Sequence, residues 1–350
     1  MGSEILVKEV DASNRYWLVR TYGGKYYSHF VQNNYIAIGW NEISNLEQIK
    51  EAGTNGKVKE ELLAKARKFY IKKETEKPGS VVNPIMRFVN EMSIGDVVVI
   101  PSENSKEIHF GVIKSNAKIV KDVINLDPGL DPLFKQRTVE WITWREKDSV
   151  DLNIFKMLSS HQAMSNVDDY SDSIDRTMYS LYVKGDRAHA VIKVGKEGEY
   201  TGTEIPDLIN ALLGTIDIYN EVTGESVSKS DVKMKISLQS DGFVFLFGNP
   251  EIIMIILGIA IAMTGGGYKI KTLKEGKWSK KESHTEVVSS GLIDAVSNAM
   301  LKMREQKHRH KIEEKEQEFR HILTALNMQL PTFDGTTEIS SVDESSDEKE

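Results

Sequence analysis

Short apolar runs alternate with polar turns through the first 145 residues, and this pattern predicts a small β-rich domain. Five runs rich in β-branched and aromatic side chains predict strands at residues 15–21, 35–40, 97–100, 108–113 and 137–143. Two helices are expected between them. One covers residues 26–32, and the other covers residues 57–73, where apolar side chains recur at helical spacing.

Residues 83–113 form the centre of this domain. Phe88 and Met92 give a short helix an apolar face, and the Gly-Asp pair at 95–96 is a turn signal before a buried strand. Pro101 has no N–H to donate to a sheet, so it closes that strand. The resulting helix–turn–strand–loop–strand unit is typical of a small barrel.

A second, α+β domain is expected at residues 178–270, after a polar helical connector at residues 148–177. Its ββαββ pattern predicts one helix covering an antiparallel sheet, with Thr203 as the helix cap. The elements are expected at residues 179–183, 188–194, 204–222, 232–238 and 243–247.

The most apolar run of the chain is Ile252–Met263. Its 12 residues are well short of the ~20 that a membrane span needs, so we expect a buried helix or an oligomer contact. Membrane insertion is the alternative, because the lysines that follow would suit an anionic lipid surface. A helical arm is expected at residues 285–329 and a disordered acidic tail at residues 330–350.

The chain has 350 residues, no cysteine and a net charge of −7. Without cysteine it has no disulfide, no thiol nucleophile and no cysteine-ligated metal. The acidic N-terminus is not a signal peptide, and we expect a cytoplasmic protein. The stretch from Lys57 to Lys77 carries eight basic residues against four acidic ones, which fits a polyanionic partner as well as a solvated surface.

Five short motifs follow one another in the N-terminal region: Tyr16-Trp17-x-Val19-Arg20, Gly39-Trp40, a stretch from Phe88 to Pro101 that contains Gly95-Asp96, Gly111-x-Ile113, and Arg137-x-Val139-x-Trp141. In this order they resemble the N-terminal domain of Mrr-type restriction proteins and, more broadly, PUA- and EVE-like domains. The resemblance covers residues 14–145 and defines a domain at 12–147. It implies a small twisted β-barrel whose open side holds a nucleobase, often a modified one.

A site for a flipped base needs flat apolar walls, hydrogen-bond partners for the base edge and cations for the flanking phosphates. The candidate walls are Trp17, Tyr26, Tyr27, Trp40 and Trp141. The candidate edge readers are Asn83, Ser102 and Asn104. The candidate phosphate ligands are Lys65, Lys68, Lys72 and Arg87. Each aromatic residue alone is better explained by core packing, so the hypothesis rests on the set.

We therefore expect a nucleic-acid-binding protein of a bacterial restriction or antiphage-defence system, without enzymatic activity, cofactor or metal. Its expected partners are DNA, including base-modified DNA, and a second copy of the chain. One alternative is a membrane-associated defence effector that senses a nucleotide or a phage component through the N-terminal domain.

A second alternative is a Mg²⁺-dependent nuclease. Mrr-type proteins carry a nuclease domain of the PD-(D/E)xK kind, in which carboxylates hold the metal. Pro206-Asp207 followed by Asp231-Val232-Lys233 comes near that motif, although Asp207 falls within a predicted helix.

Overall fold

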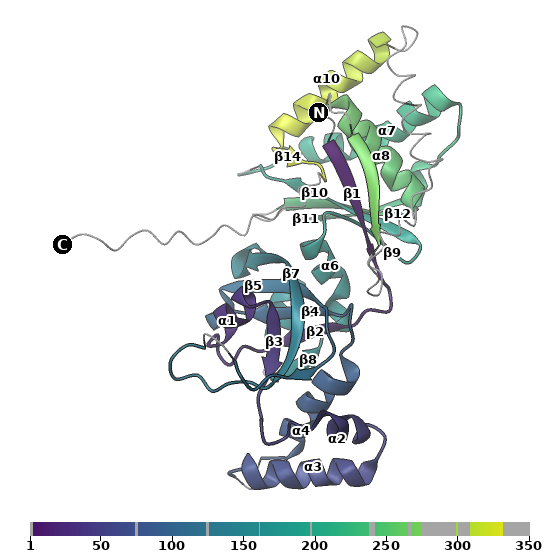
Figure 1. The fold of residues 1–350 in the computed structure, drawn as a ribbon. Helices are drawn as coiled ribbons and strands as arrows, with labels where there is room; N and C mark the ends of the chain where they lie inside the picture. The colour runs from purple at the N-terminus through teal and green to yellow at the C-terminus, as the bar shows by residue number, and fades with distance from the viewer. Residues whose placement is uncertain are drawn as a thin grey trace, which may run out of the picture.

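The computed structural model describes residues 3–73, 76–123, 126–160, 162–196, 198–237, 242–264, 268–274, 299 and 309–331. These residues form two lobes of mixed α+β structure, each with its own sheet (Figure 1). Most of the predicted arm before residue 309 and the predicted tail from residue 332 lie outside the described residues.

The sheet of the first lobe curls into a half-barrel (Figure 1). Its strand order is β3-β7-β5-β4-β2-β8, with β6 paired to β7. The long strand β7 pairs with β3 and β6 through its first residues and with β5 through the rest, so it spans the curl. The strands are β2 (Tyr16–Val19), β3 (Tyr35–Ile38), β4 (Val97–Pro101), β5 (Glu107–Ile113), β6 (Lys118–Ile119), β7 (Lys135–Glu146) and β8 (Met164–Asn166).

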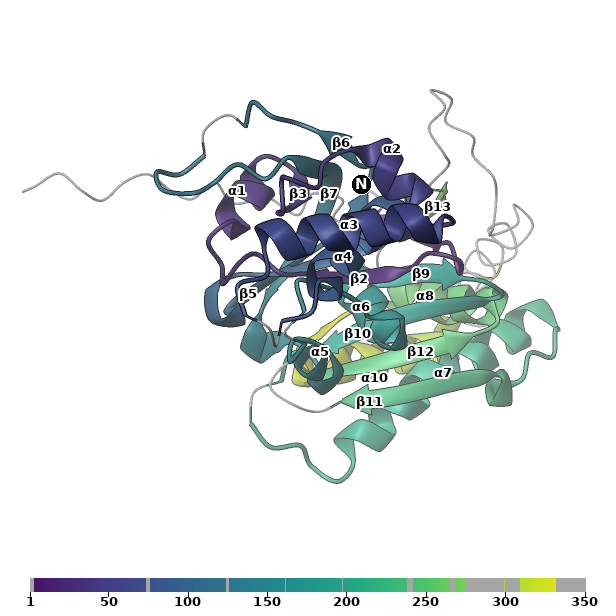
Figure 2. The same cartoon turned by 90° about the horizontal axis from the view of Figure 1, so that it is seen from below.

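Helices cover both faces of this sheet. Trp17 and Ile36 pack with the helices that precede β4, whereas Leu18 and Phe110 pack with those that follow β7. The helix α3 lies at the end of the first lobe farthest from the second lobe (Figures 1 and 2). The helices are α1 (Tyr27–Gln32), α2 (Leu46–Glu51), α3 (Gly56–Phe69), α4 (Gly79–Met86), α5 (Leu152–Met157) and α6 (Ser171–Met178).

A buried carboxylate holds the turn at Gly95-Asp96 that the sequence predicts. Asp96 accepts hydrogen bonds from the indole N–H of Trp17 at 2.8 Å and from the backbone N–H groups of Ser93 and Arg15 at 2.9 and 3.1 Å. Gly95 has a φ of +97°, a conformation that costs glycine little. The side chain of Asp96 thus joins the start of β4 to β2.

The buried side chain of Arg137 satisfies the end of the helix that continues α4. This continuation is a π-helical turn at Arg87–Glu91, and its last carbonyls have no partner within the helix. The guanidinium donates at 2.7–3.3 Å to the backbone carbonyls of Phe88, Val89, Met92 and Ser115. Burial lowers the pKa of Arg137 to about 10, so the group keeps its charge at neutral pH.

The second lobe contains a mixed sheet with the strand order β11-β12-β10-β9-β1-β13, and β14 also pairs with β10. The β9–β10 hairpin turns at Gly185-Asp186, where the sequence predicts it. The strands are β1 (Ser3–Val10), β9 (Leu181–Lys184), β10 (Arg187–Val194), β11 (Val232–Ser237), β12 (Gly242–Gly248), β13 (Tyr268–Lys274) and β14 (Met328–Gln329).

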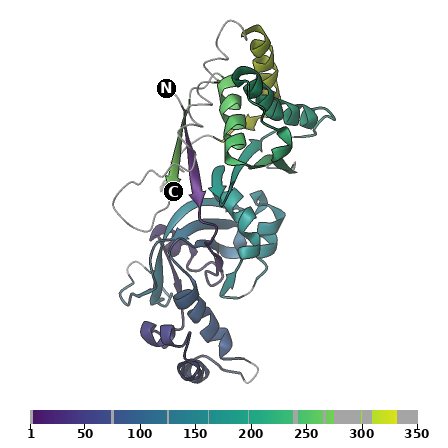
Figure 3. The same ribbon diagram turned by 90° about the vertical axis from the view of Figure 1, so that its right-hand side faces the viewer.

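More than the one predicted helix covers this sheet. The helices α7 (Glu204–Thr223), α8 (Pro250–Met263) and α10 (Arg309–Ala325) pack together on one side of it (Figure 3). Nearly all of α8 is buried in the core, and Phe319 and Leu326 dock α10 beside it. In the described part of the chain, no helix combines the length and the apolar character needed to cross a membrane.

Two segments belong to elements that their local sequence does not reveal. The strand β1 lies before the predicted domain start at residue 12, yet it pairs in parallel with β9 and β13 in the second sheet. The predicted connector at 148–177 contributes β8 to the first sheet and α5 and α6 to its core. Both placements depend on pairing between distant parts of the chain, which no short pattern encodes.

The lobes meet at Asp175 on α6, which is fully buried. Its carboxylate accepts hydrogen bonds at 2.7 Å from the hydroxyl of Tyr16 on β2 and from the ammonium of Lys184 on β9. Burial raises the pKa of Asp175, and the charge of Lys184 opposes that shift. One side chain therefore connects α6 to a strand of each lobe.

We expect Arg137→Met to destabilise the protein strongly, because it leaves four buried or partly buried carbonyls without a donor. The expected loss in the free energy of unfolding is about 3–5 kcal/mol, measured by urea denaturation. The control is Arg67→Met on the exposed face of α3, which should change stability by less than about 0.5 kcal/mol. Equal effects of the two substitutions would show that Arg137 does not hold the helix end.

Candidate functional site: an aromatic face on the half-barrel

A β-bulge brings two tryptophans to the same side of β7. Phe110 of β5 pairs with Thr143, and Gly111 pairs with Trp141, so Ile142 is an extra residue on β7. Trp141 and Trp144 are three residues apart, and regular strand alternation would direct them to opposite faces. With the extra residue between them, both lie against the ring of His109 on β5.

The ring of His109 is the centre of this cluster. Its centroid lies 5.3 Å from that of Tyr27, 5.7 Å from that of Trp141 and 6.5 Å from that of Trp144. Burial lowers the pKa of His109 to about 4, so the imidazole is neutral at pH 7. We call Tyr27, His109, Trp141 and Trp144 the aromatic face.

Hydrogen bonds determine which nitrogen of His109 carries the proton. The hydroxyl of Tyr27 lies 3.0 Å from Oε2 of Glu107 and 2.6 Å from Nδ1 of His109. An ionised carboxylate only accepts, so the single hydroxyl proton is donated to Glu107. Nδ1–H of His109 then donates to the oxygen of Tyr27, and Nε2 is the acceptor of the neutral ring.

The aromatic face is partly open to solvent. Trp144 is 40 % exposed, His109 and Trp141 are half-buried, and Glu107 beside them is exposed. A half-exposed aromatic surface with hydrogen-bond acceptors at its border can stack a flat ring and accept from that ring's amino groups.

The β4–β5 loop adds two of the predicted edge readers to the same region. The hydroxyl of Ser102 accepts from the N–H of Glu107 at 2.8 Å, and Asn104 is exposed two residues farther along. The loop packs tightly on the turn before α1, because a Cβ on Gly24 would lie 2.5 Å from the backbone of Glu103. Glycine at position 24 therefore permits this contact.

Three predicted wall residues serve the fold instead. Trp17 is completely buried, and Arg15 stacks over its ring at 4.6 Å. Tyr26 is buried, and its hydroxyl donates to the carbonyl of Asp131. The partly buried Trp40 has a φ of +61°, and its carbonyl accepts from the ammonium of Lys135.

The remaining predicted residues belong to the helices α3 and α4 and the segments that follow them. Arg87 donates to the side-chain oxygen of Gln162 and to the carbonyl of Met164, which ties its helix to β8. Four exposed side chains make up the rest of the set: Asn83, Lys65, Lys68 and Lys72. The structure thus brings Tyr27 and Trp141 against His109, Ser102 onto the backbone of Glu107 and Asn104 into the same loop as Ser102. It distributes the other candidates elsewhere.

The sequence pattern does not reveal His109, Glu107 and Trp144 as members of the site. Simple alternation directs Trp144 away from Trp141, and only the bulge reverses this. Gly111 is the one local signal of the irregularity. A Cβ there would lie 2.7 Å from the ring of Trp141, so the tryptophan needs glycine opposite it.

Comparison with known proteins gives one match. Residues 17–166 match the model of a domain of unknown function, DUF8426. The match covers the half-barrel. It begins in β2 and ends at the last residue of β8, so it includes the whole aromatic face. No curated protein and no solved structure matches the chain.

The acidic residues of the described chain do not gather into a metal site. Among the described residues, no three His, Asp or Glu side chains lie close enough together to hold a metal ion. Asp207 lies within α7, and Asp231 ends a short 3₁₀ turn before β11.

The lowered pKa of His109 predicts a pH-dependent stability. The folded pKa is about 4 and the unfolded value about 6.5, so the unfolded chain binds the proton more readily between these values. Stability should fall as the pH drops below about 6.5. His109 should contribute up to about 2 kcal/mol of that loss at pH 5, with partial exposure reducing the figure.

Urea denaturation at pH 7 and pH 5 measures this effect. His109→Gln should shrink the difference in unfolding free energy between the two pH values. The control is His321→Gln on α10, where the side chain is exposed and the difference should stay as in the native chain. An unchanged difference in His109→Gln would contradict a buried, neutral His109.

Proposed function

We propose that the first lobe binds nucleic acid and receives an unpaired base at the aromatic face. The observation that carries the proposal is the bulge in β7, which places Trp141 and the exposed Trp144 beside a neutral His109. Bulges that redirect side chains are frequent next to binding sites.

The chemistry of the aromatic face suits a base. Bases stack on tryptophan whatever their sequence, because each has a flat π-face. Glu107 and Nε2 of His109 are acceptors for the exocyclic amino group of adenine or cytosine, while Asn104 offers both a donor and an acceptor. A methyl group on a modified base would gain contact with the indole rings. Base-modified DNA is therefore the ligand that we propose.

Cations near the face would bind the flanking phosphates. Lys25 and Lys106 are exposed, and the loops that carry them touch where Gly24 meets Glu103. The lysines of α3 would extend the contact along a longer strand. Because phosphate contacts release counterions, this part of the affinity should weaken steeply with added salt.

The biological setting rests on the resemblance to Mrr-type and PUA/EVE-like domains. The half-barrel is compatible with that resemblance, and the proposed setting is a restriction or antiphage-defence system in which the protein binds DNA as an oligomer. Fold-level analogy supplies this setting, and the aromatic face supplies the binding chemistry.

The test is fluorescence anisotropy of the full-length protein with labelled single-stranded and duplex DNA, plain and base-modified, across a salt series. Trp144→Ala should weaken binding about tenfold or more, because a stacked base contributes about 1–3 kcal/mol. The control is Phe155→Ala on α5, an aromatic residue outside the face that is at least as exposed as Trp144, and this variant should bind as the native protein does.

Circular dichroism of each variant shows whether the fold is intact. Equal affinity of the native protein and of Trp144→Ala for every DNA would reject the aromatic face as the binding surface. Binding to no DNA at low salt would reject the proposal as a whole.

A further inference from the structure

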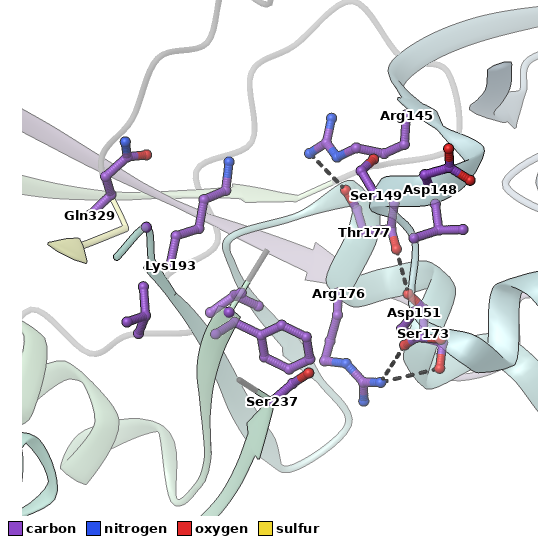
Figure 4. Close-up of a pocket in the computed structure, with 16 residues that line it drawn as sticks. Arg145, Asp148, Ser149, Asp151, Ser173, Arg176, Thr177, Lys193, Ser237 and Gln329 are labelled. Carbon is purple, nitrogen blue, oxygen red and sulfur yellow. Dashed lines mark hydrogen bonds and ion pairs between the residues drawn. The ribbon is translucent and has the colours of Figure 1, made fainter. Parts of the chain in front are cut away.

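A cavity of about 500 Å³ lies between the two lobes, away from the aromatic face (Figure 4). Its first wall consists of the end of β7, the turn that follows it and α6. Its second wall is the face of the second sheet opposite α7 and α8. Cavities of this size between lobes are the usual places for small ligands.

Cations from both lobes line this cavity. Arg145 and Arg176 belong to the first wall, and Lys193 on β10 belongs to the second. Figure 4 shows the ammonium of Lys193 and the guanidinium of Arg145 on opposite sides of the space. Arg145 is held by donation to the carbonyl of Thr177 at 3.3 Å and to the hydroxyl of Thr143 at 2.7 Å. An anion between the walls would meet positive charge from both sides.

Arg176 is held in this wall by its hydrogen bonds. One terminal nitrogen donates to Asp151 at 3.0 Å and to the hydroxyl of Ser173 at 3.1 Å. Its Nε is buried, and among the described residues it has no hydrogen-bond partner. This nitrogen has no surface that a ligand could reach, so Arg176 contributes the positive charge of its guanidinium to the wall and no free donor.

The second wall contains one aromatic side chain, Phe243. Phe243, Phe245 and Phe247 alternate along β12 and point away from the helices, because Val244 and Leu246 occupy the core side. The guanidinium of Arg176 covers Phe245 at 4.9 Å, while Phe243 lines the cavity and stays half-buried. Phe243 therefore offers a ring face beside the cations.

The hydrogen-bonding groups complete the lining. Ser149, Ser237 and Gln329 are uncharged polar residues of the lining. Two acids also line the cavity: Asp151 is paired with Arg176, and Asp148 is not paired with it. Hydroxyls, an amide and one carboxylate can bind the sugar and the base edge of a ligand whose phosphate faces the cations.

We infer that this cavity binds a nucleoside phosphate, with the phosphate between Arg145 and Lys193 and the base on Phe243. A bare inorganic anion would fill only a small part of the volume and would make no contact with the half-buried ring of Phe243. A purely apolar ligand would make no use of the positive charges of Arg145, Arg176 and Lys193 in the lining. A phosphate joined to a flat heterocycle meets both requirements at once.

Binding would also connect the lobes. The walls come from both sheets, so a ligand in contact with Arg145 and Lys193 resists separation of the two. A ligand that binds the folded chain alone raises its stability in proportion to occupancy. The melting temperature should therefore rise with ligand concentration.

The experiment is isothermal titration calorimetry of the full-length protein with adenosine 5′-monophosphate, guanosine 5′-monophosphate, adenosine and inorganic phosphate. A monophosphate should bind at least about tenfold more tightly than adenosine or phosphate alone, because only it contacts both the cations and the ring of Phe243. Lys193→Gln and Phe243→Leu should each weaken that binding about tenfold.

Two variants serve as controls. Lys233→Gln removes an exposed lysine from the neighbouring strand β11, outside the cavity, and should leave the affinity unchanged. Trp144→Ala should also leave it unchanged, which separates this site from the aromatic face. Absence of binding by both monophosphates at millimolar concentration would overturn the inference. Equal binding of phosphate and monophosphate, or equal affinity in Lys193→Gln and the native chain, would overturn it as well.

Discussion

The arrangement of the two lobes depends on the buried carboxylate of Asp175. A charged group in a protein interior is stable only when hydrogen bonds and an opposite charge surround it. Here the partners come from different lobes, the hydroxyl of Tyr16 from β2 and the ammonium of Lys184 from β9. A shift of the second sheet would move Lys184 away and leave the buried carboxylate with the hydroxyl of Tyr16 but without an opposite charge. This requirement favours one relative position of the lobes.

That position explains why the second sheet has two different faces. The helices α7, α8 and α10 bury the aliphatic side chains of one face in a continuous core. The other face carries the three phenylalanines of β12 and faces α6, where Arg176 covers Phe245. The contact between the lobes is thus aromatic and cationic rather than aliphatic. Charged side chains in such a contact need polar partners or solvent. A cavity therefore remains at the border of the contact, where these side chains lie.

Local signals predict the elements, and distant pairings decide how they meet. The helix α8 follows from Pro250 and an unbroken apolar run, and the β9–β10 hairpin follows from Gly185-Asp186. The strand β1 could not be predicted, because its partners are β9 and β13, far along the chain. The aromatic face was predicted in part, through Tyr27 and Trp141. Trp144 joins it only because Ile142 is an extra residue in β7.

Neighbouring residues on α6 connect the lobe junction to the cavity. Asp175 joins the lobes. Arg176, the next residue, lines the cavity and lies over Phe245 of the second sheet. A ligand in the cavity lies beside the same helical turn that carries Asp175. Its binding energy would therefore favour the lobe arrangement in which Tyr16 and Lys184 both reach that carboxylate. The half-barrel and the second sheet would then respond to one event, although their aromatic surfaces lie apart.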